Sequence, residues 1–250
     1  MHRFYMESDC ICGETVVWDA KESRHICRVL RLKENDVVAA FDGSGMEYEV
    51  KLTEVSPERT AGVILRASRI DREIPVHLEL VQGIAKADKM DWILQKAAEV
   101  GVSRIQPLLT KYTVVKLESD RKGKKQQRWE AIVREACKQC RRNTVPVVEE
   151  TTAFAQFLHN LETERLYILF YEATQNEPTL KELLTAERKR IQDAGVSILI
   201  GPEGGWSEEE VEEARTCGVH IVGLGPRILR TETAGLVGAA AILYEMGAME

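Results

Sequence analysis

The 250-residue sequence lacks the features that mark several special classes of protein. Its most apolar stretch, residues 235–244, is far too short to cross a bilayer. The first nine residues contain no apolar run of the kind found in a signal peptide. Six cysteines are too few, in a chain of this length, for a disulfide scaffold. We therefore expect a cytoplasmic protein with reduced cysteines and no membrane partner.

Several motifs for ligand binding and catalysis are also absent. The sequence has no G-x-x-x-x-G-K-[ST] motif for nucleoside triphosphates, no G-x-G-x-x-G dinucleotide fingerprint and no G-x-S-x-G nucleophile elbow. Cys137 and Cys140 form one C-x-x-C pair, but a structural zinc site needs four ligands and there is no second such pair. None of the five histidines belongs to an H-x-x-x-H pair. We expect structural thiols and no metal site.

What is present is ordinary globular composition, with 44% hydrophobic residues, 30% charged residues and a net charge of −6. The length allows one large domain or two modest ones. Residues 37–41 and 48–52 alternate apolar and polar side chains, and the turn at 42–45 between them predicts a hairpin. Residues 22–31 predict a short helix with a basic face. We expect this first region to form a compact β-barrel.

From about residue 74 the pattern changes to alternating strands and helices. Short apolar runs predict strands at residues 76–81, 105–109, 166–170, 196–200 and 220–224. Helices are predicted from Asp88 to Gly101, from 127 to 140, from the capping box at Ser207 to Gly218, and from 233 to 246. This alternation predicts an α/β domain with a mostly parallel, doubly wound sheet.

Charge is distributed unevenly along the chain. Residues 120–145 carry nine basic and three acidic side chains, whereas residues 146–250 carry eight basic and 18 acidic ones. A local basic block can neutralise phosphates although the whole chain is acidic. Taken by itself, the block is explained more simply as a solvated loop and an exposed helix face. Trp129, beside it, is either a stacking surface for a base or a core side chain.

Three segments of the last third follow predicted strands and are rich in glycine or arginine: residues 200–205, 223–226 and 227–234. Open α/β sheets bind ligands at the carboxyl ends of their strands, and glycine lets the backbone approach a ligand closely. Glu203 would repel a phosphate, which indicates a ligand without a pyrophosphate. Tight turns without a ligand are the simpler alternative, but two such loops and an arginine-rich third favour a site.

The two C-terminal motifs, residues 200–207 and 224–234, resemble those of the bacterial 16S ribosomal RNA (uracil-N3)-methyltransferases, the RsmE family of the SPOUT superfamily. Further matches lie at residues 24–31, 96–101 and 134–139, so the resemblance covers nearly the whole chain. Small departures are Asn35 and Arg141, at positions where the family often has glycine. Neither departure touches the C-terminal motifs.

The resemblance implies a PUA-like β-barrel at residues 1–71 that helps to hold RNA, and a mostly parallel α/β domain with a trefoil knot at residues 72–250. It also implies S-adenosylmethionine as cofactor, 16S ribosomal RNA or the small ribosomal subunit as partner, and a homodimer whose second subunit completes the site. The residues that match the cofactor site are Gly201, Pro202, Glu203, Gly204, Leu224, Gly225, Ile228, Leu229 and Thr231. The residues expected to bind RNA are Arg24, Arg28, Arg31, Lys122, Lys124, Lys125, Arg128 and Arg142.

For the reaction we expect in-line transfer of a methyl group to N3 of a uridine, which must be unpaired or extruded to be reached. Arg230 is the first candidate to stabilise charge on the uracil oxygens or to position a phosphate. A guanidinium stays protonated, so we do not assign Arg230 as a base. Glu232 is an alternative proton acceptor or a partner that orients Arg230. A purely structural ion pair between these two residues is the simpler alternative.

Other functions are compatible with the same sequence. A non-catalytic RNA-binding or ribosome-assembly factor would keep the fold without transferring a methyl group. A related knotted methyltransferase would act on a ribose 2′-hydroxyl or on another base. A nicotinamide-dependent dehydrogenase is opposed by the missing dinucleotide fingerprint. Binding of S-adenosylmethionine and the identity of the methylated nucleoside distinguish these alternatives.

Overall fold

The computed structural model describes residues 1–114, 119–173 and 177–249, except for the side chains at positions 87 and 119–122. The chain divides into two compact units. Unit 1 comprises Met1–Glu73 and Cys137–Val145, and unit 2 comprises Ile74–Ala136 and Pro146–Glu250. A short segment from the middle of the sequence therefore belongs to the N-terminal unit.

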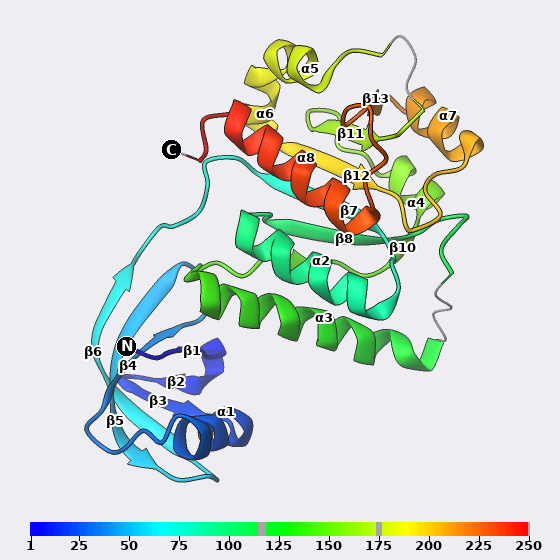
Figure 1. The fold of residues 1–250 in the computed structure, drawn as a ribbon. Coiled ribbons are helices and arrows are strands. Elements are labelled where there is room, and N and C mark those ends of the chain that lie inside the picture. Colours follow the sequence, from blue (N-terminus) through cyan, green and yellow to red (C-terminus); the bar gives the residue numbers. More distant parts are fainter. Residues whose placement is uncertain (115–118, 174–176, 250) are drawn as a thin grey trace. The chain divides into compact units, whose positions relative to one another are not determined.

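Unit 1 is built around a six-stranded sheet with the strand order β1-β4-β5-β6-β3-β2 (Figure 1). The strands are β1 (Arg3–Tyr5), β2 (Ile11–Cys12), β3 (Thr15–Trp18), β4 (Val37–Phe41), β5 (Met46–Val55) and β6 (Thr60–Arg69). β1 pairs with β4 in parallel, and the other neighbours are antiparallel. Two irregularities in the β5–β6 pairing bend these long strands. The predicted β-rich first region is confirmed.

Local signals in unit 1 were mostly sufficient to predict its elements. The hairpin of β4 and β5 forms as expected, and the Asp42 carboxylate accepts hydrogen bonds from the backbone N–H and hydroxyl of Ser44 in its turn. The predicted helix begins earlier than expected, because Asp19 accepts a hydrogen bond from the backbone N–H of Glu22 and caps α1 (Ala20–Arg24). A π-helical turn at His25–Val29 continues it.

The segment Cys137–Val145 is held in unit 1 by arginine side chains. Arg3 donates to the backbone carbonyls of Cys137, at 2.9 Å, and of Arg142, at 2.7 Å. Arg142 is 5% exposed and its guanidinium is ion-paired with Glu73. The RNA contact expected of Arg142 stays a prediction, and its guanidinium is buried and paired within unit 1.

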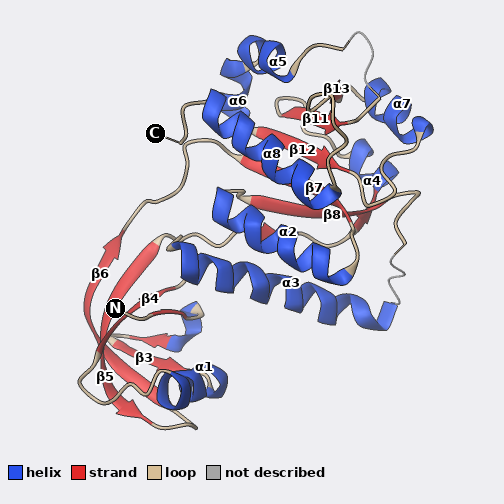
Figure 2. Ribbon diagram, in the orientation of Figure 1, coloured by secondary structure: helices blue, strands red, loops and turns tan. Residues whose placement is uncertain are grey.

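Unit 2 contains a seven-stranded sheet. Every described strand pair in it is parallel, and Figure 2 shows its strands in red among the blue helices. The strands are β7 (Leu78–Gly83), β8 (Arg104–Leu109), β9 (Val147–Val148), β10 (Thr152–Ala153), β11 (Leu166–Phe170), β12 (Val196–Ile200) and β13 (His220–Val222). Their order is β10-β8-β7-β12-β11-β13, and β9 also pairs with β8. β7, β11 and β12 are buried along their whole length, as expected for parallel strands covered on both faces.

Helices cover both faces of this sheet. They are α2 (Ala87–Val100), α3 (Ser119–Cys140), α4 (Phe154–His159), α5 (Leu180–Ala186), α6 (Arg188–Ala194), α7 (Glu208–Thr216) and α8 (Thr231–Glu245). α2 and α8 lie side by side on one face, and α3 lies beside α2 (Figure 1), where Arg128 pairs with Asp91. α4 and α7 pack on the other face through a core that contains Phe154, Trp206 and Val211. The predicted α/β architecture is confirmed.

The helix boundaries show where local signals succeeded. The capping box at the start of α7 is confirmed, because Ser207 and Glu210 each accept a hydrogen bond from the other's backbone N–H. The expected N-cap at Asp88 is wrong: Lys86 is the N-cap of α2, and Asp88 lies in the first turn, where a carboxylate favours the helix dipole. Gly101 ends α2 as predicted.

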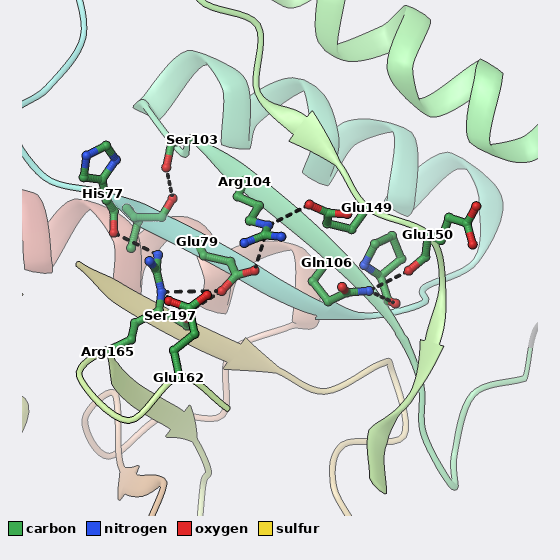
Figure 3. A network of polar contacts seen from close by, with 12 residues as sticks. His77, Glu79, Ser103, Arg104, Gln106, Glu149, Glu150, Glu162, Arg165 and Ser197 are labelled. Carbon is green, nitrogen blue, oxygen red and sulfur yellow. Dashed lines mark hydrogen bonds and ion pairs between the residues drawn. The ribbon is translucent and has the colours of Figure 1, made fainter. Parts of the chain in front are cut away.

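A polar network lies at the amino ends of the central strands (Figure 3). The Glu79 carboxylate of β7 is 5% exposed and accepts a hydrogen bond from the Ser197 hydroxyl of β12 at 2.5 Å. The Arg165 guanidinium lies 3.6 Å from Glu79 and donates to Ser197 at 2.7 Å. Arg104 of β8 approaches Glu79 to 3.7 Å. The buried Glu79 carboxylate is therefore both ion-paired and hydrogen-bonded. Its contacts connect β7, β8 and β12 at their amino ends.

Two classes of feature are absent from the part of the chain that the structure describes. Each helix there is either too short or too polar to span a bilayer. No three histidine, cysteine, aspartate or glutamate side chains within the same residues are grouped so that they would hold a metal ion. The Cys137 thiol forms a hydrogen bond with Cys140 that favours the protonated form, and this bond together with burial raises the pKa of Cys137.

Candidate functional site

A cavity of about 410 Å³ lies in unit 2, at the carboxyl ends of β11, β12 and β13. The segments that follow these three strands supply most of its wall, and α2 and α8 supply the rest. Its lining residues are Lys89, Phe170, Tyr171, Glu172, Ile200, Gly201, Pro202, Glu203, Gly204, Gly205, Trp206, Leu224, Gly225, Arg227, Ile228, Leu229, Arg230, Thr231 and Ala234. The volume is that of an ordinary small-molecule site, and the position is the one where open α/β sheets bind ligands.

Two glycines lie where the loop after β12 packs so closely against neighbouring segments that a side chain would not fit. A Cβ atom on Gly83, at the end of β7, would lie 2.6 Å from the backbone nitrogen of Pro202. A Cβ atom on Gly204 would lie 2.7 Å from the Cβ atom of Tyr112. Both distances are shorter than real contacts allow, so larger residues would displace the loop that follows β12.

A buried hydrogen-bond chain ties the two principal loops of the cavity together. The Thr231 hydroxyl donates to the backbone carbonyl of Gly201 at 2.6 Å, and it accepts from the Gln82 side-chain amide at 2.9 Å. The same amide donates to the carbonyl of Gly83 at 2.9 Å. Gln82 is fully buried and Thr231 is 7% exposed. The start of α8 is therefore fastened to the ends of both β7 and β12.

Four charged side chains meet at one side of the cavity. The Lys89 ammonium lies 3.2 Å from a carboxylate oxygen of Glu232 and 3.8 Å from one of Glu203. The backbone N–H of Lys86 donates to the same Glu203 oxygen at 3.1 Å. The Arg230 guanidinium is 80% exposed and lies 4.0 Å from the Glu232 carboxylate. Arg230 is therefore held loosely and can face a second molecule.

The Glu232 carboxyl is ionised in this surrounding. Partial burial raises the pKa of Glu232, but its own backbone N–H, the Lys89 ammonium and the Arg230 guanidinium outweigh burial and hold the pKa below its usual range. Because all three favour the charged form, the carboxylate persists at lower pH than that of an ordinary glutamate.

All nine residues predicted to bind the cofactor line this cavity, as does Arg230. Glu232 lies beside it, in contact with the lining residue Lys89. Their roles in binding and catalysis stay predictions. The sequence reasoning did not single out Lys89, or Phe170 and the two residues that follow β11. Phe170 and the two residues after it could have been found from the sequence, because residues 166–170 are predicted as a strand and the carboxyl ends of parallel strands lie at one edge of the sheet. Lys89 had none.

The residues predicted to bind RNA are found on both units. Arg24, Arg28 and Arg31 are exposed on unit 1. On α3, Lys124 and Arg128 are exposed, and Arg128 is also paired with Asp91. The Lys122 side chain lies outside the described residues.

The aromatic side chain beside the basic block is explained by packing. Trp129 is 2% exposed and so belongs to the core, and the Lys125 ammonium lies 5.3 Å from the centre of its ring. A base cannot stack on a tryptophan that is covered in this way. The block therefore presents exposed positive charge, without an aromatic platform at Trp129.

Comparison with protein families matches both units. The family described as "RNA methyltransferase domain" matches residues 72–243. The family described as "RNA methyltransferase PUA domain" matches residues 19–65.

Individual relatives agree with these matches over nearly the full length. The chain is 33% identical to the ribosomal RNA small subunit methyltransferase E of Bacillus subtilis, over 90% of this chain and 88% of the relative. A protein of the same name from Neisseria gonorrhoeae, whose crystal structure was solved bound to S-adenosyl methionine, is 34% identical in sequence. The two structures align with a TM-score of 0.87 over 98% of this chain and 97% of the relative. A Legionella pneumophila structure in complex with the bound cofactor SAM is 29% identical, with a TM-score of 0.88 and coverage of 97% and 96%.

Proposed function

Since this chain belongs to the RNA methyltransferase family that includes ribosomal RNA small subunit methyltransferase E, we propose that it methylates N3 of a uridine in 16S ribosomal RNA with S-adenosylmethionine. One observation carries the proposal: the two C-terminal motifs and the end of β11 converge on one cavity, fastened by Gln82 and Thr231. An enzyme with this substrate works in the cytoplasm. The trefoil knot that the resemblance implies is part of the proposal.

The residues around the cavity fit this cofactor. Leu224, Ile228 and Leu229 offer apolar surface, and the backbone of the glycine-rich loop at 201–205 is accessible to a ligand. The carboxylates of Glu203 and Glu232 suit a cation better than a phosphate. When bound, S-adenosylmethionine supplies a methyl carbon activated by the positive charge of its sulfonium.

The protein's own contribution to the chemistry falls to Arg230 and Glu232. Removing the proton from uracil N3 leaves negative charge shared with the two uracil oxygens, and the exposed Arg230 guanidinium stabilises that charge. The ionised Glu232 accepts the proton or orients Arg230, and both roles need its carboxylate form. The uridine is presented unpaired or extruded, since N3 lies inside a base pair.

The test of this assignment is Arg230→Ala. We expect turnover to fall by about 100-fold or more, the size of effect found on removing one charge-stabilising donor. The affinity for S-adenosylmethionine, measured by calorimetry, should stay within about threefold, because the side chain is 80% exposed. Arg215→Ala removes another exposed arginine, on α7, and serves as the control. Unchanged turnover in Arg230→Ala would refute the role.

The site of methylation is tested separately from the catalytic residues. Labelled methyl transfer to small subunits or free 16S ribosomal RNA, followed by mass spectrometry of the nucleosides, should give N3-methyluridine. A ribose-methylated nucleoside or another methylated base would assign the chain to a different specificity. Cofactor binding without any methyl transfer would favour the non-catalytic RNA-binding factor.

We propose RNA contacts for Arg24, Arg28 and Arg31 on unit 1, and for Lys122, Lys124, Lys125 and Arg128 on α3. Each lysine that neutralises a phosphate adds about 0.9 to the slope of log affinity against log salt. Replacing Lys124 and Lys125 with Gln should therefore lower the slope by about 1–2. The control replaces Lys181 and Lys189, two exposed lysines of α5 and α6. If the slope did not change, Lys124 and Lys125 would be solvent-exposed side chains that do not contact RNA.

We also propose that the chain forms a homodimer through α8. This helix is apolar on nearly all sides, yet Val237 and Tyr244 are 41% and 75% exposed. A helix of this kind is normally buried, and a second copy would cover it. Sedimentation should give twice the chain mass of 28.2 kDa, and Val237→Glu should shift it to the monomer. A monomeric wild-type protein would contradict the proposal.

A further inference from the structure

Lys89 is the one cavity-lining residue contributed by α2 among those that the structure describes. It lies in the first turns of that helix, where no motif of the sequence had drawn attention to it. Its ammonium lies between two carboxylates that come from different segments: Glu203, in the loop after β12, and Glu232, in the first turn of α8. The side chain is 32% exposed, so its charge is accessible to the cavity and is not part of a core ion pair.

The charged groups around Glu232 come from three elements. Lys89 of α2 approaches it to 3.2 Å, and Arg230, from the residue before α8, approaches it to 4.0 Å. Glu203 reaches the same ammonium at 3.8 Å, from the loop after β12. Glu203 has a second anchor in the backbone N–H of Lys86, whereas the cationic partners of Glu232 are Lys89 and Arg230. Arg230 is needed for the substrate, which leaves Lys89 as the resident countercharge.

We propose that Lys89 is a positioning residue for methyl transfer: it joins Glu203 to Glu232 and keeps the Glu232 carboxylate ionised while Arg230 turns to the uracil. The inference rests on the proposed function and goes beyond it, because it assigns a role to a residue outside the two C-terminal motifs. Without the ammonium, the Glu203 and Glu232 carboxylates would lose the cation that they share, and Glu232 would keep only the loosely held Arg230 beside it. Like charges at short range favour protonation of one partner, and a protonated Glu232 would neither accept a proton nor orient Arg230.

The first measurement needs neither cofactor nor RNA. The Glu232 carboxyl is titrated by carbon NMR, with its signal assigned by comparison with Glu232→Gln. In Lys89→Met, which keeps the aliphatic stem, the titration midpoint should rise by about 0.5–1 pH unit, a modest shift because the pair is partly exposed to solvent. Lys89→Arg should restore the midpoint. Lys96→Met breaks another lysine–glutamate pair of α2, to Glu99, and should leave it unchanged.

The second measurement is the pH dependence of kcat/KM. Activity that needs ionised Glu232 falls as the pH drops through the midpoint of this carboxyl. The acidic limb in Lys89→Met should therefore move to higher pH by the same amount, and Lys89→Arg should move it back. Below both midpoints, a shift of one unit corresponds to about tenfold lower activity than wild type. Lys96→Met should follow the wild-type profile.

Two results would overturn the proposal. An unchanged Glu232 midpoint in Lys89→Met, with a folded protein by thermal melting, would show that the lysine does not set the charge state of this carboxyl. A raised KM for RNA with a reduced salt slope and an unmoved acidic limb would instead make Lys89 a phosphate contact. Failure of the proposed function is distinguishable from both, since the wild type would then transfer no methyl group although the NMR titration still reports on the pair.

Discussion

The Thr231 hydroxyl allows the fastening of the cavity to be tested with two closely matched substitutions. It donates to the Gly201 carbonyl at 2.6 Å and accepts from Gln82 at 2.9 Å, and it is 7% exposed. Thr231→Val keeps the shape of the side chain and removes the hydroxyl. Thr231→Ser keeps the hydroxyl and removes one methyl group, so the two variants separate the hydrogen bonds from the packing.

The magnitude follows from what each variant leaves unpaired. In Thr231→Val, the Gly201 carbonyl and one N–H of Gln82 lose their short partners while buried, at about 1–3 kcal/mol each, so we expect about 2–6 kcal/mol of lost stability. In Thr231→Ser the missing methyl group costs about 1 kcal/mol. Because the two fastened loops line the cavity, the valine variant should also bind S-adenosylmethionine about tenfold more weakly, which corresponds to about 1.4 kcal/mol.

Urea unfolding measures the first quantity and titration calorimetry the second. The reasoning is refuted if the two variants agree within about 0.5 kcal/mol in unfolding free energy, since that margin covers surface substitutions without a specific role. If the two variants differed in stability but bound S-adenosylmethionine equally well, the hydrogen bonds would stabilise the fold without contributing to cofactor binding.

Three further changes test other parts of the molecule. Gly204→Ala should weaken cofactor binding at least about tenfold by calorimetry, because the new methyl group would meet Tyr112; an affinity like that of wild type would contradict the close packing. Hydrogen bonding by Arg72, helped by Arg3, outweighs burial and holds the pKa of Glu47 below its usual value. The Glu47 carboxylate therefore contributes its full stability near neutral pH, and this contribution is lost as the pH falls through the lowered pKa. The unfolding free energy that Glu47→Gln loses relative to wild type, measured with urea, should therefore become smaller in acid. Ser207→Ala should lower the unfolding free energy by about 1 kcal/mol in the same assay, because it removes the N-cap of α7, whereas Ser207→Asp keeps a capping oxygen and should stay close to wild type.

Much of the fold could be predicted because its signals are local. The hairpin at 42–45 and the capping box at Ser207 depend on residues two or three positions apart, whose hydrogen bonds form whenever the segment folds. Buried parallel strands such as β11 and β12 are continuous apolar runs, and their carboxyl ends lie on one edge by topology alone. These rules, with the resemblance of the C-terminal motifs, led to the residues that line the cavity.

The failures have a common cause as well. Asp88 is as good a capping residue as Asp19, yet Lys86 is the N-cap of α2 and Asp88 lies inside the helix. The pairing of Arg142 with Glu73, 69 positions away, was likewise not predicted. Neither outcome is visible in the neighbouring residues.

The sequence by itself determined the alternation of strands and helices, the acidic and basic regions, and the glycine-rich loops at the carboxyl ends of strands. Only the tertiary structure decided which side chains meet there. Gln82 reaches Thr231 across 149 positions, and Lys89 reaches Glu232 from another helix. Propensity, capping and turn formation act between residues a few positions apart, whereas these pairs exist only after the sheet has brought distant strands together.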